Sequence, residues 1–504
     1  MFLNSQPAPW SRRSRRPVGA AIVVVVALTL SGCGNRLSDE RLAAGAGATA
    51  VVAASDTGAV APGDAGVAVG AVDTGALAPG VGGQVPVVGA PSPPGTVPAA
   101  VTGGTAAQPG KGTGAAAAVP GKSAAGASAP KACTGNEAPL ILGQTGSFSG
   151  LIGASIGAHR LGVAMWVKAV NAAGGIQCHP VKVYQADDGS SPAQAASNVN
   201  DFVKNKGAVA LLDICDPIVL SAVRAEIAKL KVPIVGGDLS DPGWTQDPLV
   251  FAQGVSPIQG FAGGIATAAK VAKVTKISVL YCVEAAICEL INKSKDEMAA
   301  SSGTTLVHSQ SISLTQSSYT AECQNAKNAG AQMIFGGVDG SALTRMGTSC
   351  ASLGYFPAFG GPGIAFSETL SKNQALRKAG VYLGTVSAPF MTTDQPGTKA
   401  FHEAAEKYAP GQAIDQSASD GWTSGKLMEA ALNALGAELR DRPITTADIF
   451  SGLYLLKGET LGGLASPLTY KKGQPSPING CYFSMVLGPD GFFPPFGSKR
   501  QGKC

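Results

Sequence analysis

Alternating strand and helix signals run twice through the C-terminal part of the chain, and this pattern constrains the fold more than any other feature. Short apolar runs typical of buried strands are each followed by apolar residues at helical spacing. Such alternation requires a parallel sheet with helices on both faces. The first run predicts strands at 139–144, 181–184, 208–213 and 232–235, and helices around 163–170, at 192–204 and at 218–230. The second predicts strands at 276–281, 304–312, 331–336 and 356–359, and helices at 289–300, 319–329 and 341–353.

Two such runs within residues 131–504 predict two lobes, each with its own parallel sheet, and a cleft between them. Ligands of open α/β sheets bind beyond the carboxyl ends of the strands. The loops expected at that edge are 145–150, 213–217, 236–241, 282–286, 338–341 and 360–365. The candidate ligand-binding residues in these loops are Ser149, Asp216, Asp238, Leu239, Ser240, Glu284, Val338, Asp339 and Pro362.

Residues 1–32 have the pattern of a secretory signal peptide. An arginine cluster at 12–16 precedes an uncharged run at 18–30, which is shorter than the roughly 20 apolar residues of a membrane span. The run ends at Leu30-Ser-Gly-Cys33, which resembles the lipobox of bacterial lipoproteins. That resemblance implies a diacylglyceryl group on Cys33 and a lipid anchor in the cell membrane. The alternative is an ordinary signal peptide with a chance cysteine, and export by the Sec or the twin-arginine route stays open.

Residues 33–130 have the composition of a disordered tether. The stretch 43–130 is almost entirely Ala, Gly, Pro, Val, Ser and Thr, and the octapeptide at 56–63 nearly recurs at 73–80. Small side chains bury too little area to offset the entropy lost on ordering the backbone. A flexible chain of this length has a mean reach of roughly 50 Å. A spacer with no role would have the same composition. The folded domain is expected at 131–504.

Several short motifs, in this order, resemble the type 1 periplasmic binding proteins of ABC transporters, in the leucine/isoleucine/valine-binding branch. The resemblance covers about residues 138–500 and is carried by Gly146-Ser-Phe-Ser-Gly150, Val170-Asn-Ala-Ala-Gly-Gly-Ile176, Asp187-Asp188, Ser240-Asp-Pro242 and Phe359-Gly-Gly-Pro-Gly363. It implies two Rossmann-like lobes joined by a three-segment hinge that closes around a small molecule. Lobe one is then expected at about 131–254 and 387–450, and lobe two at about 255–386 and 451–504.

The resemblance carries ligand contacts onto this chain only in part. In amino-acid binders of this branch, the backbone at Asp238 and the hydroxyl at Ser240 match ligand contacts, whereas Asp216 stands where a serine is usual. The glutamate that pairs a ligand ammonium is missing from the turn at 360–363, and Val338 replaces a usual aromatic. Two interpretations therefore stay open for Asp216 and Asp238. They supply the missing negative charge to a cationic ligand, or they cap the helices that follow.

Other functional classes gain little support from the sequence. The G-x-S-x-G motif at 153–157 has His159 nearby, but about ten residues separate its serine from the preceding strand, and a nucleophile elbow needs a tight strand-to-helix turn. The four histidines show no metal-ligand spacing, and no P-loop motif occurs. A formal charge of +5 is small for 504 residues. We therefore expect no enzymatic activity, metal, cofactor or nucleic-acid partner.

Cysteine use is typical of an exported protein. Ten cysteines less Cys33 leave nine, so at least one thiol stays unpaired. In the topology that the resemblance implies, four pairs come close: Cys133 with Cys178 before neighbouring strands, Cys323 with Cys350 on consecutive helices, Cys282 with Cys288 around a small loop, and Cys481 with Cys504 at the C-terminal tail. Cys215 is then the free thiol, although the connectivity stays open at this point.

Together these features predict an extracytoplasmic, monomeric solute-binding lipoprotein that touches the membrane only through its lipid. Its ligand would be a small polar molecule, such as an amino acid or an amide, delivered to an ABC permease. The alternative is a ligand-sensing receptor domain that acts through a partner protein.

Overall fold

The computed structural model describes residue 133 and residues 137–504, apart from residue 367. The predicted signal peptide, Cys33 and the predicted tether at 33–130 lie outside the described residues. Within the described part, no helix has both the length and the apolar character needed to cross a bilayer.

The first lobe is built on a parallel sheet with the strand order β2-β1-β3-β4-β5. Successive side chains of a strand point to opposite faces of its sheet. Accordingly, Leu211 and Leu212 of the third strand pack into two different hydrophobic clusters, one on each face. The strands are β1 (Leu140–Gly146), β2 (Val181–Asp187), β3 (Ala210–Ile214), β4 (Ile234–Gly237) and β5 (Val250–Phe251).

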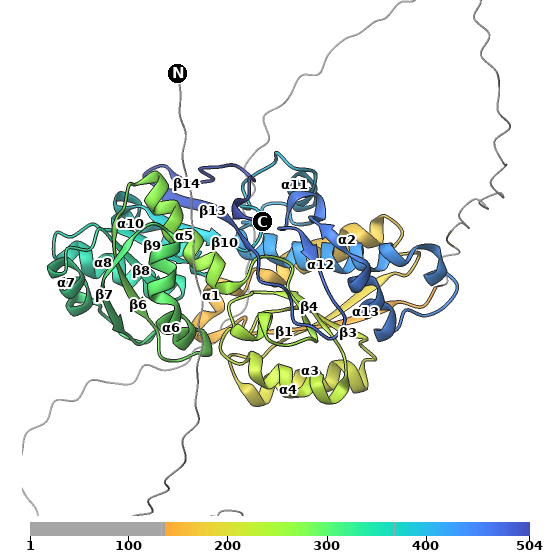
Figure 1. Ribbon diagram of the computed structural model, residues 1–504. Coiled ribbons are helices and arrows are strands. Elements are labelled where there is room, and N and C mark those ends of the chain that lie inside the picture. The colour runs from red at the N-terminus through yellow and green to blue at the C-terminus, as the bar shows by residue number, and fades with distance from the viewer. Residues whose placement is uncertain (1–132, 134–136, 367) are drawn as a thin grey trace, which may run out of the picture. The chain divides into compact units, whose positions relative to one another are not determined.

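Helices cover both faces of this sheet (Figure 1). One face carries α3 (Pro192–Asn200) and α4 (Leu220–Leu230), and the other carries α2 (His159–Ala172), α11 (Pro396–Tyr408), α12 (Gln416–Leu435) and α13 (Thr446–Leu455). The α2 and α12 helices approach closely because Gly425 has no side chain. A Cβ atom there would lie 2.3 Å from the ring of Trp166.

The second lobe is built on a larger sheet with the order β14-β13-β10-β9-β8-β6-β7, and β15 pairs with β13. The strands from β7 to β10 run parallel, whereas β13 is antiparallel to β10. Their bounds are β6 (Lys276–Tyr281), β7 (Thr305–Ser311), β8 (Met333–Gly337), β9 (Ala358–Pro362), β10 (Val381–Thr385), β13 (Gly480–Gly488), β14 (Gly491–Phe493) and β15 (Gln501–Lys503).

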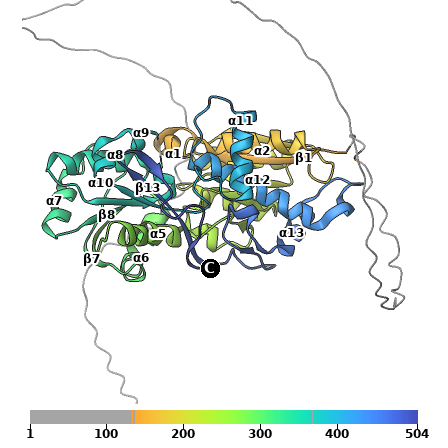
Figure 2. The ribbon, with the colours of Figure 1, turned by 90° about the horizontal axis from the view of Figure 1, so that it is seen from above.

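The helices of the second lobe are gathered around this sheet, as the two views in Figures 1 and 2 show. They are α5 (Pro257–Val271), α6 (Ala286–Ser301), α7 (Thr320–Asn328), α8 (Gly340–Ser352), α9 (Glu368–Lys372) and α10 (Gln374–Ala379). Smaller elements are α1 (Gly153–Ile156), β11 (Lys457–Glu459), β12 (Leu468–Thr469), a π-helical turn at Asp201–Asn205, and 3-10 turns at Gly150–Ile152, Pro242–Thr245, Gly363–Ala365, Gly436–Leu439 and Leu461–Gly463. The predicted two-lobe α/β fold is confirmed.

The chain crosses between the lobes three times, and the crossing segments are hydrogen-bonded to one another. The N–H of Ala252 donates to Ser476 Oγ at 3.0 Å, and its carbonyl accepts from the hydroxyl of Tyr470 at 2.6 Å. The N–H of Val255 donates to the carbonyl of Val386 at 3.3 Å. Residues from all three crossings therefore meet in one small region, which is the arrangement expected of a three-segment hinge.

The late part of the chain is divided between the lobes differently from the sequence-based expectation, which assigned 451–504 to lobe two. In the structure, Leu461, Leu464 and Tyr470 belong to the same hydrophobic cluster as α2 and α12, in the first lobe. The stretch is apolar enough to extend that core. The second sheet takes up the chain again only at Gly480, where β13 begins.

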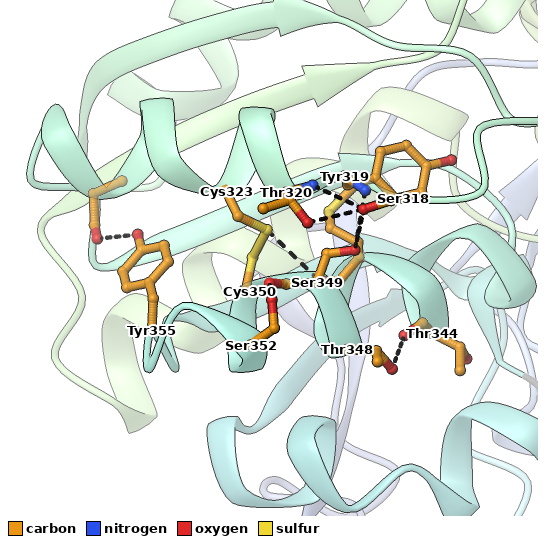
Figure 3. Close-up of a disulfide and its surroundings, with 12 residues drawn as sticks. Ser318, Tyr319, Thr320, Cys323, Thr344, Thr348, Ser349, Cys350, Ser352 and Tyr355 are labelled. Carbon is orange, nitrogen blue, oxygen red and sulfur yellow. Dashed lines mark hydrogen bonds between the residues drawn. A yellow bond between two sulfur atoms is a disulfide. The ribbon is translucent and has the colours of Figure 1, made fainter.

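The structure joins the four cysteine pairs that the sequence analysis names: Cys133–Cys178, Cys282–Cys288, Cys323–Cys350 and Cys481–Cys504. Figure 3 shows the third pair, where α7 and α8 lie side by side and Tyr319 donates its N–H to Ser349 Oγ at 3.0 Å. Among the described cysteines, Cys215 is the free thiol, and it is buried.

Replacing Cys323 and Cys350 together with alanine should lower the free energy of unfolding by about 3.5 kcal/mol. The reason is that a link across 27 residues restricts the unfolded chain. The matched control is the alanine pair at Cys282 and Cys288, whose link spans only 6 residues and should be worth about 2 kcal/mol. Denaturant unfolding without reductant measures both. A larger loss for the short loop would contradict the prediction.

Candidate functional site

A cavity with about 420 Å³ of free space, part of it open to solvent, lies between the two lobes. Four of the predicted ligand-binding residues line it: Ser240 from lobe one, and Val338, Asp339 and Pro362 from lobe two. Most of the remaining lining is apolar and includes Ile152, Ile218, Phe261, Ile287, Ile291 and Leu314. The cavity therefore suits a compact apolar group contacted by both lobes.

A second, smaller cavity adjoins the first and lies nearer the crossing segments, with about 290 Å³ of free space, part of it open to solvent. The two share Ser240, Phe261 and Pro362. Its lining adds two carboxyl groups, Asp238 after β4 and Asp420 on α12. Among the described residues that line either cavity, none is a lysine, arginine or histidine, so the combined space is acidic.

The loop after β4 is shaped by the carboxylate of Asp238. Its Oδ1 atom accepts the N–H of Ser240 at 2.7 Å and also the Ser240 hydroxyl, and Leu239 between them adopts a φ of 53°. Its Oδ2 atom is buried and has no hydrogen-bond partner. Burial raises the pKa of Asp238 to about 6, against the lowering effect of the Ser240 hydrogen bonds and of His159. Asp238 thus holds its own loop with one oxygen and leaves the other unused.

Asp339 plays the corresponding part in lobe two, at the start of α8. Its Oδ1 atom accepts the N–H groups of Ser341 at 2.7 Å and Ala342 at 3.3 Å, which makes Asp339 the N-cap of the helix. Its Oδ2 atom is buried without a hydrogen-bond partner. Burial raises the pKa of this carboxyl group above its usual value, although the two N–H donors oppose the shift.

A buried ion pair lies beneath the ligand face of lobe one. His159 Nδ1 lies 3.1 Å from both oxygens of Asp213, which also accept Ser424 Oγ at 2.8 Å and Gln144 Nε2 at 2.7 Å. Burial alone would lower the pKa of His159, but the Asp213 carboxylate raises it to about 9. His159 is therefore positively charged near neutral pH, and this residue, which follows the G-x-S-x-G motif, serves packing and charge balance.

Asp420 is the functional residue that sequence reasoning missed. It accepts hydrogen bonds from Gln416 Nε2 at 3.0 Å and from the Ser387 hydroxyl, and burial raises its pKa to about 6. It lies on α12, 182 residues after Asp238 in the sequence, and in no strand-end loop. The one available signal was a polar residue beside Trp422, which itself packs against Phe401 in the core.

Asp216 lies outside the linings of both cavities, contrary to the prediction, although its neighbour Pro217 lines the first one. Its Oδ1 atom accepts the hydroxyl of Ser147 at 3.3 Å, and burial, followed by the neighbouring Asp188, raises its pKa well above the usual value. The helix-cap interpretation also fails for this residue, because the N-cap of α4 is Val219. Nor does Asp238 cap a helix, since the turn that follows begins after Asp241.

Ser149 and Glu284, two further predicted site residues, also lie outside the cavity linings. The N–H of Ser149 donates to Asp187 at the exposed rim of lobe one. Glu284 accepts the hydroxyl of Ser313 at 2.5 Å and the N–H of Leu314 at 2.8 Å. It therefore holds in place a segment whose Leu314 does line the cavity.

Two groups of side chains in the described residues have the proximity of metal ligands. His159, Asp213 and Cys215 offer ligand atoms within 4.8 Å of one another, but the Asp213 oxygens already accept three side-chain donors. In the other group, Cys282 and Cys288 are joined in a disulfide beside Glu284. Neither arrangement leaves a free set of ligands.

The chain matches the model of one protein family, described as periplasmic binding protein, over residues 139–471. Comparison with curated proteins gives no match. Similar solved structures include a substrate-binding periplasmic protein from Ralstonia solanacearum, with 20% identity and a TM-score of 0.61 over 71% of this chain and 100% of that one.

Two further similar structures contain ligands. One is an ABC transporter solute-binding protein from R. palustris in complex with benzoate, with 15% identity and a TM-score of 0.57 over 71% of this chain and 96% of that one. The other is the branched-chain amino acid transporter substrate-binding protein LivJ from Streptococcus pneumoniae in complex with isoleucine, with 17% identity and a TM-score of 0.57 over 72% and 99% of the two chains. These likenesses establish the fold and not the ligand.

The buried ion pair predicts a loss of stability at alkaline pH. The folded pKa of His159, about 9, exceeds its ordinary value of 6.5, so its stabilising effect is complete below pH 6.5 and is lost as the pH rises through 9. Melting curves from pH ~7 to ~10 should show this loss. The variant His159→Gln, which cannot be charged, should melt lower at pH ~7 and depend less on pH. Parallel curves for the two proteins would show that His159 is neutral.

Proposed function

The chain belongs to the periplasmic binding protein family, and we propose that it is an extracytoplasmic solute-binding lipoprotein that delivers a small ligand to an ABC permease. The observation that carries the proposal is the cavity between the lobes, lined by residues of both. Bending of the three crossing segments would open and close this space. A ligand contacted by both lobes stabilises the closed form, because only that form offers all of its contacts.

A direct contact between the lobes supports this view of closure. The N–H of Gly340, at the start of α8, donates to the hydroxyl of Ser155 in α1 at 3.2 Å. Opening the cleft would break this hydrogen bond and expose apolar residues such as Ile152 and Val338 to water. The same contact uses the serine of the G-x-S-x-G motif for positioning, and we propose binding without catalysis.

We assign the ligand contacts to the residues that line the two cavities. In lobe one these are Asp238, Leu239 and Ser240 after β4, and in lobe two they are Val338, Asp339 and Pro362. The similar structures hold benzoate in one case and isoleucine in another. Since one fold serves both molecules, the chemistry of the ligand has to come from the side chains of this chain.

The anchor is the second part of the proposal. The motif ending at Cys33 resembles a lipobox, and 33–130 has the composition of a flexible linker. A lipid at Cys33 would keep the binding domain at the cell surface, close to a permease. The linker would let the domain reach partners at a mean distance of roughly 50 Å.

A thermal-shift screen against amino acids, amides, urea, polyamines and small organic acids tests the binding function. A ligand at 100 times its Kd should stabilise the protein by about 2.7 kcal/mol. Ser240→Ala should weaken that ligand by roughly 5- to 150-fold, because it removes a polar group from the lining of both cavities. Ser149→Ala, outside the linings, is the control and should bind normally. Absence of any stabilising solute would contradict the proposed function.

Cys33→Ala should release the protein from membranes into the medium, because the acyl chains have no other attachment site in the proposed mechanism. Cell fractionation followed by immunoblotting measures the distribution. Cys215→Ala is the matched control, since that thiol is buried in the domain and the variant should stay with the membrane. Continued membrane retention of the Cys33 variant would refute the lipid anchor.

A further inference from the structure

Two aspartates in the cavity linings, one from each lobe, have the same hydrogen-bonding arrangement, which Asp216 shares outside the linings. Asp238 and Asp339 are both 3% exposed, and both line the joined cavities. Each uses Oδ1 to accept donors from its own loop, and each has a buried Oδ2 atom without a hydrogen-bond partner. A buried carboxylate oxygen without a partner is unfavourable, so this pair has an unmet need for a donor or a positive charge.

Donors of the loop after β4 and of the start of α8, which could hold a ligand carboxylate, are already engaged. In lobe one, the N–H and hydroxyl of Ser240 donate to Asp238, whose own N–H donates to the carbonyl of Ile214 at 3.1 Å. In lobe two, the first N–H groups of α8 donate to Asp339 and to Ser155. The start of a helix normally attracts anions, but here a resident carboxylate occupies it.

No lysine, arginine or histidine among the described residues lies in the cavity linings, although His159 and Arg345 act on Asp238 and Asp339 from outside them. Lysine and arginine are also absent from the buried polar residues of the described chain. The one buried cation nearby, His159, is paired with Asp213. Asp420 adds a third carboxyl group to the lining.

We infer that the ligand of this cleft is an amine cation with a compact apolar body and no carboxylate, and that Asp238 and Asp339 bind its positive charge from the two lobes. This inference rests on the proposed function and specifies its ligand. The cationic group supplies N–H donors to the two free oxygens, and the apolar body contacts residues such as Phe261, Ile291 and Val338. Closure removes the charged group from water, which strengthens its attraction to the carboxylates.

The pKa shifts of Asp238 and Asp339 reflect how deeply the two carboxyl groups are buried. Burial raises the pKa of Asp238 to about 6 and that of Asp339 above its usual value. A cation bound between the two carboxyl groups would favour their ionised form. In the absence of a ligand, their burial is a cost to the folded protein.

The test is calorimetry with matched pairs of probes that share a body and differ in charge. The first set is isoamylamine, isoamyl alcohol, leucine and isocaproate, and the second is benzylamine and benzoate. Each amine should bind at least about 10-fold more tightly than the anion of its set, and isoamylamine should bind more tightly than leucine. Equal or tighter binding of leucine, isocaproate or benzoate would overturn the inference, as would the failure of both amines to bind at millimolar concentration.

Variants then test which carboxyl groups bind the positive charge of the amine. Asp238→Asn and Asp339→Asn should each weaken the better amine by about 10- to 100-fold, while binding of isoamyl alcohol, where measurable, should change little. Asp216→Asn is the matched control, because it removes an equally buried carboxylate of lobe one outside both linings. Melting curves of the free variants should show no loss of stability, since the asparagine at position 339 can still cap α8.

The two proposals fail in different ways. If the broad screen finds a solute that both lobes bind, but amines show no advantage and Asp238→Asn leaves affinity unchanged, the solute-binding function stands and the cation inference is wrong. If no solute stabilises the protein in either experiment, both are wrong. An unchanged affinity in Asp238→Asn together with a loss in Asp216→Asn would move the charged site to the neighbouring pair of acids and overturn the assignment.

Discussion

The ion pair between His159 and Asp213 is the interaction on which the ligand face of lobe one depends. Asp213 lies near the end of the central strand β3 and receives donors from α2, α12 and β1, so one carboxylate joins three elements. Removing one partner of a buried pair leaves the other charge uncompensated, at a cost of about 3–5 kcal/mol. Because α12 also carries Asp420 and contacts β4, the position of the acidic cavity follows from this pair.

The strand-end loops of this protein present hydrogen-bond acceptors, whereas strand-end loops without acidic residues present free N–H donors. Free N–H groups at such loops and at helix starts form a receptor for anions. Here Asp238 and Asp339 satisfy those N–H groups from within the chain and turn a donor surface into an acceptor surface. Each aspartate thus has a structural role through one oxygen and is free to act on a ligand through the other. Under the proposed assignment, such a change would alter the ligand class without altering the fold.

The sequence predicts the fold because buried strands and amphipathic helices leave strong periodic signals. The order of these elements also predicts which cysteines come close together. No helix was predicted at α5, which contains Gly260, Gly263 and Gly264, residues that weaken a helical pattern. The structure needs a small residue there, because a Cβ at Gly264 would lie 2.9 Å from the carbonyl of Tyr382. The sequence also predicts that the site lies at the carboxyl edge of the strands. It does not predict which side chains of the loops at that edge line the cavities. Ser147 and Asp188 turn Asp216 inward, and Asp420 arrives from a distant helix.

The free thiol of Cys215 bears on how the chain acquires its covalent links. Thiol–disulfide exchange proceeds through the thiolate, so a sulfur that stays protonated is a poor participant. Burial, and then the charge of Asp213, raise the pKa of Cys215 well above its usual value. Once the centre of lobe one has folded, this sulfur is both inaccessible and chemically quiet. Disulfides can then form only among the other cysteines. The acidic interior of the lobe thereby keeps Cys215 out of thiol–disulfide exchange.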